Sequence, residues 1–171
     1  MLNYYPNFLD INLIDSIEKY VEKNISLPTW KSSLYWPNHI RHSSALVQIL
    51  PLPHIEKELR PYYSKILPET QKLHMEINYY IWPPLSYIPS HNDNHVEEQI
   101  ASSIYLNKEW NIDHGGLFLY NKENKIYAIP PIFNSCIINN NHVTHSTTLI
   151  TTNAPYRRTL QIFFYDIKYK D

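Results

Sequence analysis

The sequence of 171 residues has little glycine, one cysteine and no marked excess of either charge. Its cysteine, Cys136, excludes an internal disulfide, and the apolar run around it favours a buried small side chain over a nucleophile. The formal net charge of -1, without an evident basic cluster, makes nucleic acid an unexpected partner. No apolar run is long enough to span a bilayer and no signal peptide opens the chain, so we expect a cytoplasmic protein without a membrane partner.

Aromatic residues and proline are abundant by contrast. The sequence contains 15 Tyr and 13 Pro against 2 Gly, and 43% of its residues are hydrophobic while 18% are charged. This balance is typical of a globular chain with a substantial core, and the length fits one domain. Abundant aromatics, divided into short segments by proline, favour strands over long helices.

Residues 1–70 are predicted to be mainly helical and to support the rest of the fold. A first helix is expected after Asp10 or Asn12, either of which suits an N-cap, because four apolar side chains then share one face. These side chains are Leu13, Ile14, Ile17 and Val21. A second helix is expected to begin at Pro53 and to be interrupted or kinked at Pro61.

From residue 73 onward the pattern changes to one typical of strands. Six strands are predicted, over residues 73–82, 100–106, 117–120, 126–129, 136–139 and 159–167. Short strands at near-regular spacing, with turn residues at 113–116 and 121–124, predict a barrel or sandwich with helices packed outside one sheet. We find no repeat and expect a single domain over 1–171, with helical support over 1–70 and a β core over 73–168.

The segment His91-Asn92-Asp93 carries the first candidate chemistry. Side chains alternate along an extended segment, so His91 and Asp93 point to the same side and can bind one ion. With the distant His145 they supply two imidazoles and one carboxylate, a set that suits non-haem Fe(II) with an open face for oxygen and a co-substrate. A His-x-Asp pair also arises by chance, so the pattern gains weight only from its surroundings.

Further patterns surround this pair, in one continuous order along the chain. They are Tyr80-x6-Tyr87 before His91, followed by residues 103–110, 115–118, 129–134 and 157–165. Over residues 77–166 the sequence resembles the catalytic core of the 2-oxoglutarate/Fe(II) dioxygenases, especially the prolyl 4-hydroxylase-like branch. The resemblance implies a mainly β (α+β) fold, a distorted double-stranded β-helix of the jelly-roll or cupin-like kind, with the N-terminal helices packed on one sheet.

The resemblance also implies a set of catalytic residues and cofactors. His91, Asp93 and His145 would be the metal ligands for Fe(II), with 2-oxoglutarate as co-substrate, O2 as oxidant and ascorbate as a further candidate cofactor. Arg157 would pair with the distal carboxylate of 2-oxoglutarate, a task that suits the planar guanidinium fork.

Three further residues are implied to bind the co-substrate. Tyr105 would donate a phenolic hydrogen bond to the distal carboxylate, and Tyr80 would lie near the metal-bound end. Thr159 follows the arginine with the two-residue period of a strand, so its hydroxyl can face the same pocket.

Two alternatives remain open at the level of sequence. His142 could replace His145 as the distal ligand, although the shorter spacing from His145 to Arg157 favours His145. Arg158 could replace Arg157, but strand alternation puts only one of the two inside a barrel, and the aromatic strand that follows favours Arg157.

The implied activity is hydroxylation of an unactivated C–H bond, with release of succinate and CO2. Halogenating relatives have a small residue where this chain has Asp93, so the carboxylate favours hydroxylation. We expect the substrate to be an amino-acid or peptidyl side chain or a small metabolite, and the sequence indicates no oligomeric state. The alternative is a non-catalytic jelly-roll protein that binds a small ligand or a partner and has a degenerate metal site.

Overall fold

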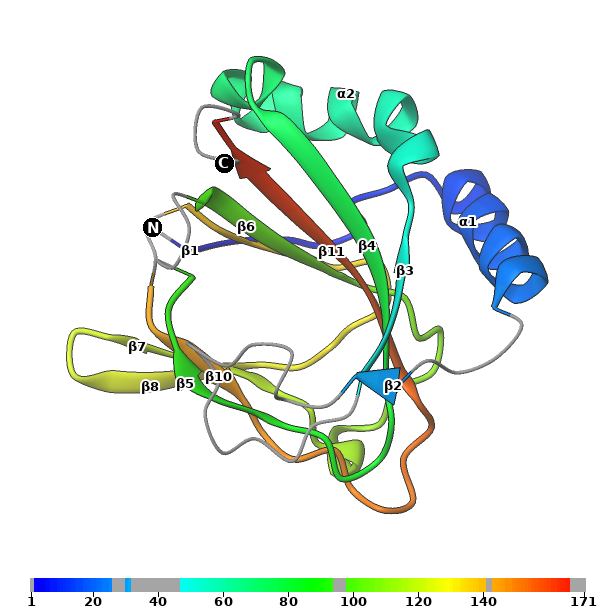
Figure 1. Ribbon diagram of the computed structural model, residues 1–171. Helices are drawn as coiled ribbons and strands as arrows, with labels where there is room; N and C mark the ends of the chain where they lie inside the picture. Colours follow the sequence, from blue (N-terminus) through cyan, green and yellow to red (C-terminus); the bar gives the residue numbers. More distant parts are fainter. Residues whose placement is uncertain (1, 26–29, 32–46, 94–97, 141–142, 167–171) are drawn as a thin grey trace.

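The computed structural model describes residues 2–25, 30–31, 47–93, 98–140 and 143–166 (Figure 1). Two antiparallel sheets form most of the structure. The larger sheet has the strand order β1-β9-β6-β11-β4-β3-β2, and the smaller sheet has the order β5-β10-β7-β8. Each sheet therefore joins strands that are distant in the sequence.

The strands of the larger sheet are β1 (Leu2–Tyr5), β2 (Trp30–Lys31), β3 (Val47–Pro51), β4 (His74–Trp82), β6 (Glu98–Tyr105), β9 (Cys136–Asn139) and β11 (Arg157–Tyr165). Those of the smaller sheet are β5 (Ile88–His91), β7 (Phe118–Lys122), β8 (Lys125–Ile129) and β10 (His145–Thr147). Among the described residues, short 3-10 turns lie at η2 (Pro53–Ile55), η3 (Pro68–Gln71) and η4 (Ile112–His114).

Two α-helices, α1 (Ile11–Asn24) and α2 (Glu56–Ile66), lie against the larger sheet (Figure 1). Helix α1 begins where Asp10 accepts a hydrogen bond from the Asn12 N–H at 2.8 Å, so Asp10 is the N-cap. Helix α2 continues through Pro61, and the predicted interruption there is wrong. Pro61 lies inside the helix and has no N–H to donate to the carbonyl four residues earlier, but its ring is exposed and the helix continues to Ile66. In the part of the chain described, neither helix has the length and apolarity needed to cross a membrane.

The outer face of the larger sheet packs on these helices and forms the main core. Along β11 the side chains of Leu160, Ile162 and Phe164 are fully buried on this face. Tyr63 of α2 contacts Phe164, with ring centroids 5.0 Å apart. Each such side chain contributes about 1.5–3 kcal/mol by leaving water, so this face supplies much of the stability.

The inner face of the same sheet faces the smaller sheet. Tyr105 and Ile137 from the larger sheet pack with Phe118 from the smaller one, which joins the two sheets. On the inner face Thr159 of β11 is the register partner of Tyr80 on β4 and of Tyr105 on β6. These three side chains therefore lie side by side inside the fold.

Most of the predicted strands are present with small shifts of their ends. The strand predicted at 136–139 is β9 itself, and the one predicted at 159–167 is β11, which begins two residues earlier at Arg157. Residues 1–70 are less helical than expected, because they also supply β1, β2 and β3. These short strands form through pairing with distant partners such as β9 and β4, which local sequence does not reveal.

Candidate active site

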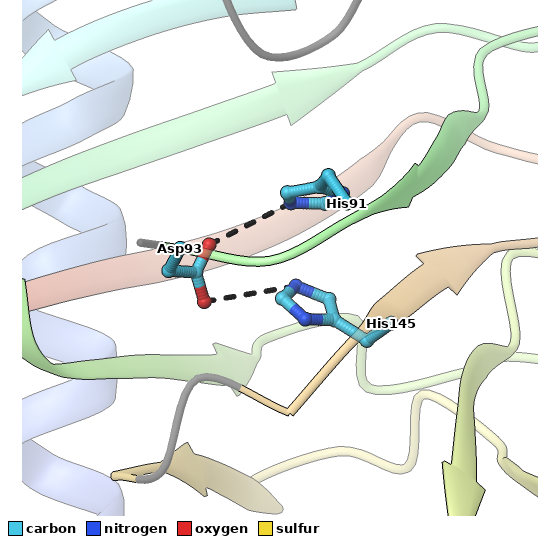
Figure 2. A group of neighbouring side chains, drawn as sticks. All are labelled: His91, Asp93 and His145. Carbon is cyan, nitrogen blue, oxygen red and sulfur yellow. Dashed lines mark ion pairs between the residues drawn. The ribbon is translucent and has the colours of Figure 1, made fainter. Parts of the chain in front are cut away.

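Three side chains from the ends of two short strands meet inside the fold. His91 ends β5, Asp93 follows it, and His145 begins β10 directly opposite His91 in the register. One ligand atom from each lies within 4.8 Å of the others, and all three residues are partly buried (Figure 2). The structure therefore brings together the three residues that the sequence singled out as metal ligands. His142 lies outside the described residues.

Backbone carbonyls orient both imidazoles. Nδ1 of His91 lies 2.9 Å from the Pro89 carbonyl, and Nδ1 of His145 lies 2.9 Å from the Val143 carbonyl. A carbonyl accepts only, so each Nδ1 carries the proton and each Nε2 is left with a lone pair. Those Nε2 atoms are the ones that face Asp93.

The Nε2 atoms of the two imidazoles face different oxygens of one carboxylate. His91 Nε2 lies 3.6 Å from Asp93 Oδ1, and His145 Nε2 lies 3.8 Å from Asp93 Oδ2 (Figure 2). Lone pairs that converge in this way repel each other unless a proton or a cation lies between them. The set of two nitrogens and one oxygen fits a divalent transition metal such as Fe(II), so these residues could hold the ion.

The pKa values of Asp93 and His145 are both shifted in the direction that favours metal binding near neutral pH. Burial alone would raise the pKa of Asp93, yet the charge or donated proton of a protonated imidazole at His91 or His145, together with the Asn139 amide, lowers it overall. Burial lowers the pKa of His145 and outweighs the opposing charge of Asp93. A metal ligand must be a carboxylate or a neutral imidazole, and these are the forms that the shifts favour.

Arg157 at the start of β11 is a buried cation on the inner face. It is 3% exposed, its Nη1 donates to the Gly116 carbonyl at 3.0 Å, and its guanidinium lies 5.3 Å from the centroid of the Trp82 ring. Its Nε has no hydrogen-bond partner. Among the described residues no carboxylate lies within ion-pair distance of it. Burial lowers its pKa, but a guanidinium stays protonated, so Arg157 is a buried positive charge without a carboxylate partner in the part of the chain that the structure describes.

The glycine turn before β7 allows the backbone to approach this arginine. Gly116 has φ 67°, which other residues rarely adopt, and a Cβ there would lie 3.2 Å from Arg157 Nη1. The Gly-Gly pair therefore lies against the guanidinium of Arg157. Arg158, the alternative anchor, lies on the opposite side of the strand, where it pairs with Glu18 at 2.8 Å.

Hydroxyl groups lie near Arg157 on the same face and could also donate to a carboxylate. Burial raises the pKa of Tyr105 to about 12, with Arg157 opposing the shift, so the phenol stays a neutral donor. Thr159 accepts from Trp82 Nε1 and Gln161 Nε2, both at 3.3 Å, which places its hydroxyl among the polar groups of this face.

Sequence reasoning missed other residues that shape this site. Phe118 stacks on His145 with ring centroids 4.8 Å apart, and Asn139 lies 3.4 Å from Asp93 Oδ2. A polar residue at the end of the buried run Cys136-Ile137-Ile138 was the signal that could have identified Asn139. Nothing in the local pattern distinguishes Phe118 from an ordinary core residue.

Comparison with known proteins agrees with this geometry. Residues 75–165 match the family model described as the 2OG-Fe(II) oxygenase superfamily, which is more than half of the chain. A search among curated proteins gives no significant match. The chain belongs to the 2OG-Fe(II) oxygenase superfamily and is a 2-oxoglutarate-dependent dioxygenase. The expected enzyme is thereby confirmed over the non-catalytic alternative.

Solved structures show the same fold at low sequence identity. A prolyl-4-hydroxylase from Pseudomonas putida superposes with a TM-score of 0.71 at 14% identity, over 96% of this chain and 92% of that one. A prolyl hydroxylase from Trichoplax adhaerens, in complex with a hypoxia inducible factor oxygen degradation domain peptide fragment, gives 0.73 at 18% identity, over 99% and 85%. The expected double-stranded β-helix fold, shared with these prolyl hydroxylases, is confirmed.

Proposed function

We propose that this protein hydroxylates an unactivated C–H bond and converts 2-oxoglutarate to succinate and CO2 in the same reaction. In this proposal one domain, residues 1–171, holds Fe(II) through His91, Asp93 and His145. The distal carboxylate of 2-oxoglutarate binds Arg157. Ascorbate is proposed as a further cofactor, and the cytoplasm as the location.

The observation that carries the proposal is the buried, unpaired guanidinium of Arg157. A charge removed from water costs several kcal/mol unless a partner compensates it, as an order of magnitude. In the described structure this cation has one carbonyl, one aromatic ring and an Nε without a partner. A dicarboxylate with one end on Arg157 and the other at the His-Asp-His cluster would supply the missing anion.

Three neighbouring side chains would orient the co-substrate. We assign to Tyr105 a hydrogen bond to the same carboxylate, because its phenol stays protonated and it lies on the inner face close enough to Arg157 to feel its charge. Thr159 lies between Tyr105 and Tyr80 in the register, so its hydroxyl is within reach of the same ligand. Tyr80 is assigned to the metal-bound end.

The chain's own residues set the conditions for the reaction. Bound iron and 2-oxoglutarate supply the activation of O2 and the cleavage of the substrate C–H bond. His91 and His145 present unprotonated Nε2 atoms, and Asp93 presents a carboxylate, so these three residues would hold the ion. Phe118, stacked on His145, keeps water from that side of the ring. The presence of Asp93 leaves no free position for a halide, which favours hydroxylation.

An amino-acid or peptidyl side chain is the proposed substrate, with a small metabolite as the second candidate. The similar Trichoplax structure holds a peptide fragment, which favours the peptidyl case. No nucleic acid or membrane partner is proposed, because the net charge is -1 and no basic cluster is evident.

The test is an anaerobic titration with Fe(II) and 2-oxoglutarate, followed by visible spectroscopy. We expect a charge-transfer band in the unmodified protein and its loss in H91A and D93A. The matched control is H54A, because His54 packs on Tyr20 at the surface, with ring centroids 4.1 Å apart, and lies outside the cluster. It should retain the band.

A saturating iron titration that gives no band in the unmodified protein would contradict the proposed site. The reaction itself is then tested by succinate formation over a panel of amino acids, peptides and small metabolites. An activity that depends on Asp93 and gives a hydroxylated product is the expected result, and a halogenated product would contradict it.

A further inference from the structure

Asn139, the last residue of β9, is a buried amide in an otherwise apolar strand. It is 5% exposed and follows Cys136, Ile137 and Ile138, which are all buried. Burying an amide costs about 1–3 kcal/mol unless its hydrogen-bonding groups are used. Its partners therefore explain why an amide occupies this position.

Both ends of the amide bind the backbone of Val143, two residues before His145. The Val143 N–H donates to Asn139 Oδ1 at 2.9 Å, and Asn139 Nδ2 donates to the Val143 carbonyl at 3.1 Å. A flipped amide would oppose donor to donor and acceptor to acceptor, so the partners fix its orientation. The same carbonyl accepts the Nδ1 proton of His145. Asn139 thus holds the group that sets the tautomer of this imidazole.

The second hydrogen of the amide points toward Asp93. Asn139 Nδ2 lies 3.4 Å from Asp93 Oδ2 and 3.5 Å from His145 Nδ1. That Nδ1 already carries a proton, which it donates at 2.9 Å, so it cannot accept from the amide. The two hydrogens of Nδ2 are therefore matched to two acceptors, the Val143 carbonyl and the Asp93 carboxylate.

We propose that Asn139 is a positioning residue for the metal ligands, a role that rests on the proposed iron site. One amide fixes the tautomer and ring of His145 through Val143 and also aims the carboxylate of Asp93. His91 is held independently, by the Pro89 carbonyl. Loss of such an outer partner lowers metal affinity by about 10- to 100-fold in other metal sites, and we expect that range here.

The first test measures metal affinity in N139L and N139S. Mn(II) serves as the probe, its binding followed by electron paramagnetic resonance without 2-oxoglutarate, so that turnover plays no part. We expect the dissociation constant to rise about 10- to 100-fold in N139L, which keeps the bulk but loses the polar groups. N139S should fall between N139L and the unmodified protein, because a hydroxyl can donate only one hydrogen bond.

Asn134 provides a matched control. It is also a buried asparagine whose amide bonds both backbone groups of one residue, donating to the Leu9 carbonyl and accepting from its N–H, each at 2.8 Å. Its amide has no contact with the candidate ligands in the described structure. The backbone of Asn134 is held at a strained φ of 57°, and N134S loses side-chain bonds to Leu9 that support it. N134S should therefore lower the melting temperature of the metal-free protein while leaving Mn(II) affinity within about threefold.

The second test observes the tautomers directly, by nitrogen-15 NMR of the metal-free protein. In N139L we expect His145 to lose its uniform Nδ1–H form while His91 retains it, a selective change that general loosening of the fold would not cause. Two results in folded N139L would overturn the proposal. One is an unchanged His145 tautomer, and the other is a Mn(II) affinity within threefold of that of the unmodified protein. Where N139L does not fold, the same thresholds apply to N139S.

The proposed iron site and the role of Asn139 can fail separately. If the unmodified protein binds neither Mn(II) nor Fe(II), the proposed function fails, and the tautomer measurement still decides whether Asn139 controls His145. If the unmodified protein binds the metal and N139L binds it equally well, only the role of Asn139 is wrong.

Discussion

The outer face of the seven-stranded sheet is mainly apolar and is covered by α1 and α2. Its inner face presents the unpaired guanidinium of Arg157 together with amides and hydroxyls from the same strands. Along β11 a shift of one residue changes the surroundings completely: Leu160 is fully buried in the main core, and its neighbour Gln161 accepts a hydrogen bond from Ser103 at 2.7 Å. Strand alternation thus separates stability from chemistry within one element. The buried charge of Arg157 is tolerated because the other face contributes the packing energy.

The largest effect should come from the pair of adjacent arginines. R157M should weaken 2-oxoglutarate binding by about 2–5 kcal/mol, which is roughly 30-fold or more, because a buried charge pair loses one partner. Since the guanidinium is unpaired in the ligand-free protein, the free energy of unfolding without ligand should not fall. Calorimetric titration with 2-oxoglutarate and urea denaturation measure the two quantities.

R158M is the control on the opposite face. It removes the partly exposed ion pair with Glu18, which contributes about 0–1 kcal/mol, and should leave 2-oxoglutarate affinity unchanged. Equal losses of affinity in the two variants would show that the two faces are not separated as described.

The second effect concerns stability. L160A should lower the free energy of unfolding by about 2–5 kcal/mol, because it leaves a cavity in the core between the sheet and the helices. The neighbouring change Q161A loses hydrogen bonds on the inner face and should cost about 0.5–1.5 kcal/mol. Urea denaturation at fixed pH measures both, and a larger loss in Q161A would break the comparison.

A smaller effect is expected for the phenol beside Arg157. Y105F keeps the ring but loses a hydrogen bond to a charged group, so 2-oxoglutarate affinity should fall by about 1.5–3 kcal/mol at most. Stability should change little, because the ring remains packed with Phe118 and Ile137. Isothermal titration of both proteins checks the affinity. An unchanged dissociation constant would remove Tyr105 from the pocket.

The smallest effect on stability should come from the thiol of Cys136, which is buried on the outer face. Burial raises the pKa of Cys136 to about 12, so at pH 8 the folded protein should react negligibly with iodoacetamide and the urea-unfolded protein should react readily. Above about pH 8.5 the thiol of the unfolded chain, with a pKa of about 8.5, loses its proton, while the buried thiol of the folded protein keeps it. This group therefore makes the free energy of unfolding fall as pH rises above about 8.5. Mass spectrometry of the alkylated protein measures the first effect, and rapid labelling of the folded chain would contradict it.

Much of the site follows from local sequence rules, because its key groups lie in strands. Alternation was enough to place His91 with Asp93 and to show that only one of Arg157 and Arg158 faces the interior. The preference for Arg157 came from the aromatic strand that follows it. The contacts of Asn139 with Val143 and Asp93 could not be foreseen, because they depend on how β9 and β10 pack against a third segment.

Parts of the fold escaped sequence reasoning for the same reason. Strand β1 exists through its pairing with β9, more than 130 residues away, and its four residues have no strong pattern of their own. The close approach of the Gly116 carbonyl to Arg157 likewise joins segments that are far apart in the sequence.

The smaller sheet has one consequence for local unfolding. His91 and His145 are register partners on β5 and β10, strands of four and three residues. Strands this short contribute few hydrogen bonds, and the edge of the sheet they form should open on its own more often than the helix-covered core. A metal ion bound by both imidazoles would cross-link the two strands beside their shared backbone bonds. The amide protons of β5 and β10 would then exchange with solvent more slowly in the metal-bound protein, while those of β4 and β11 would report the global stability in either state.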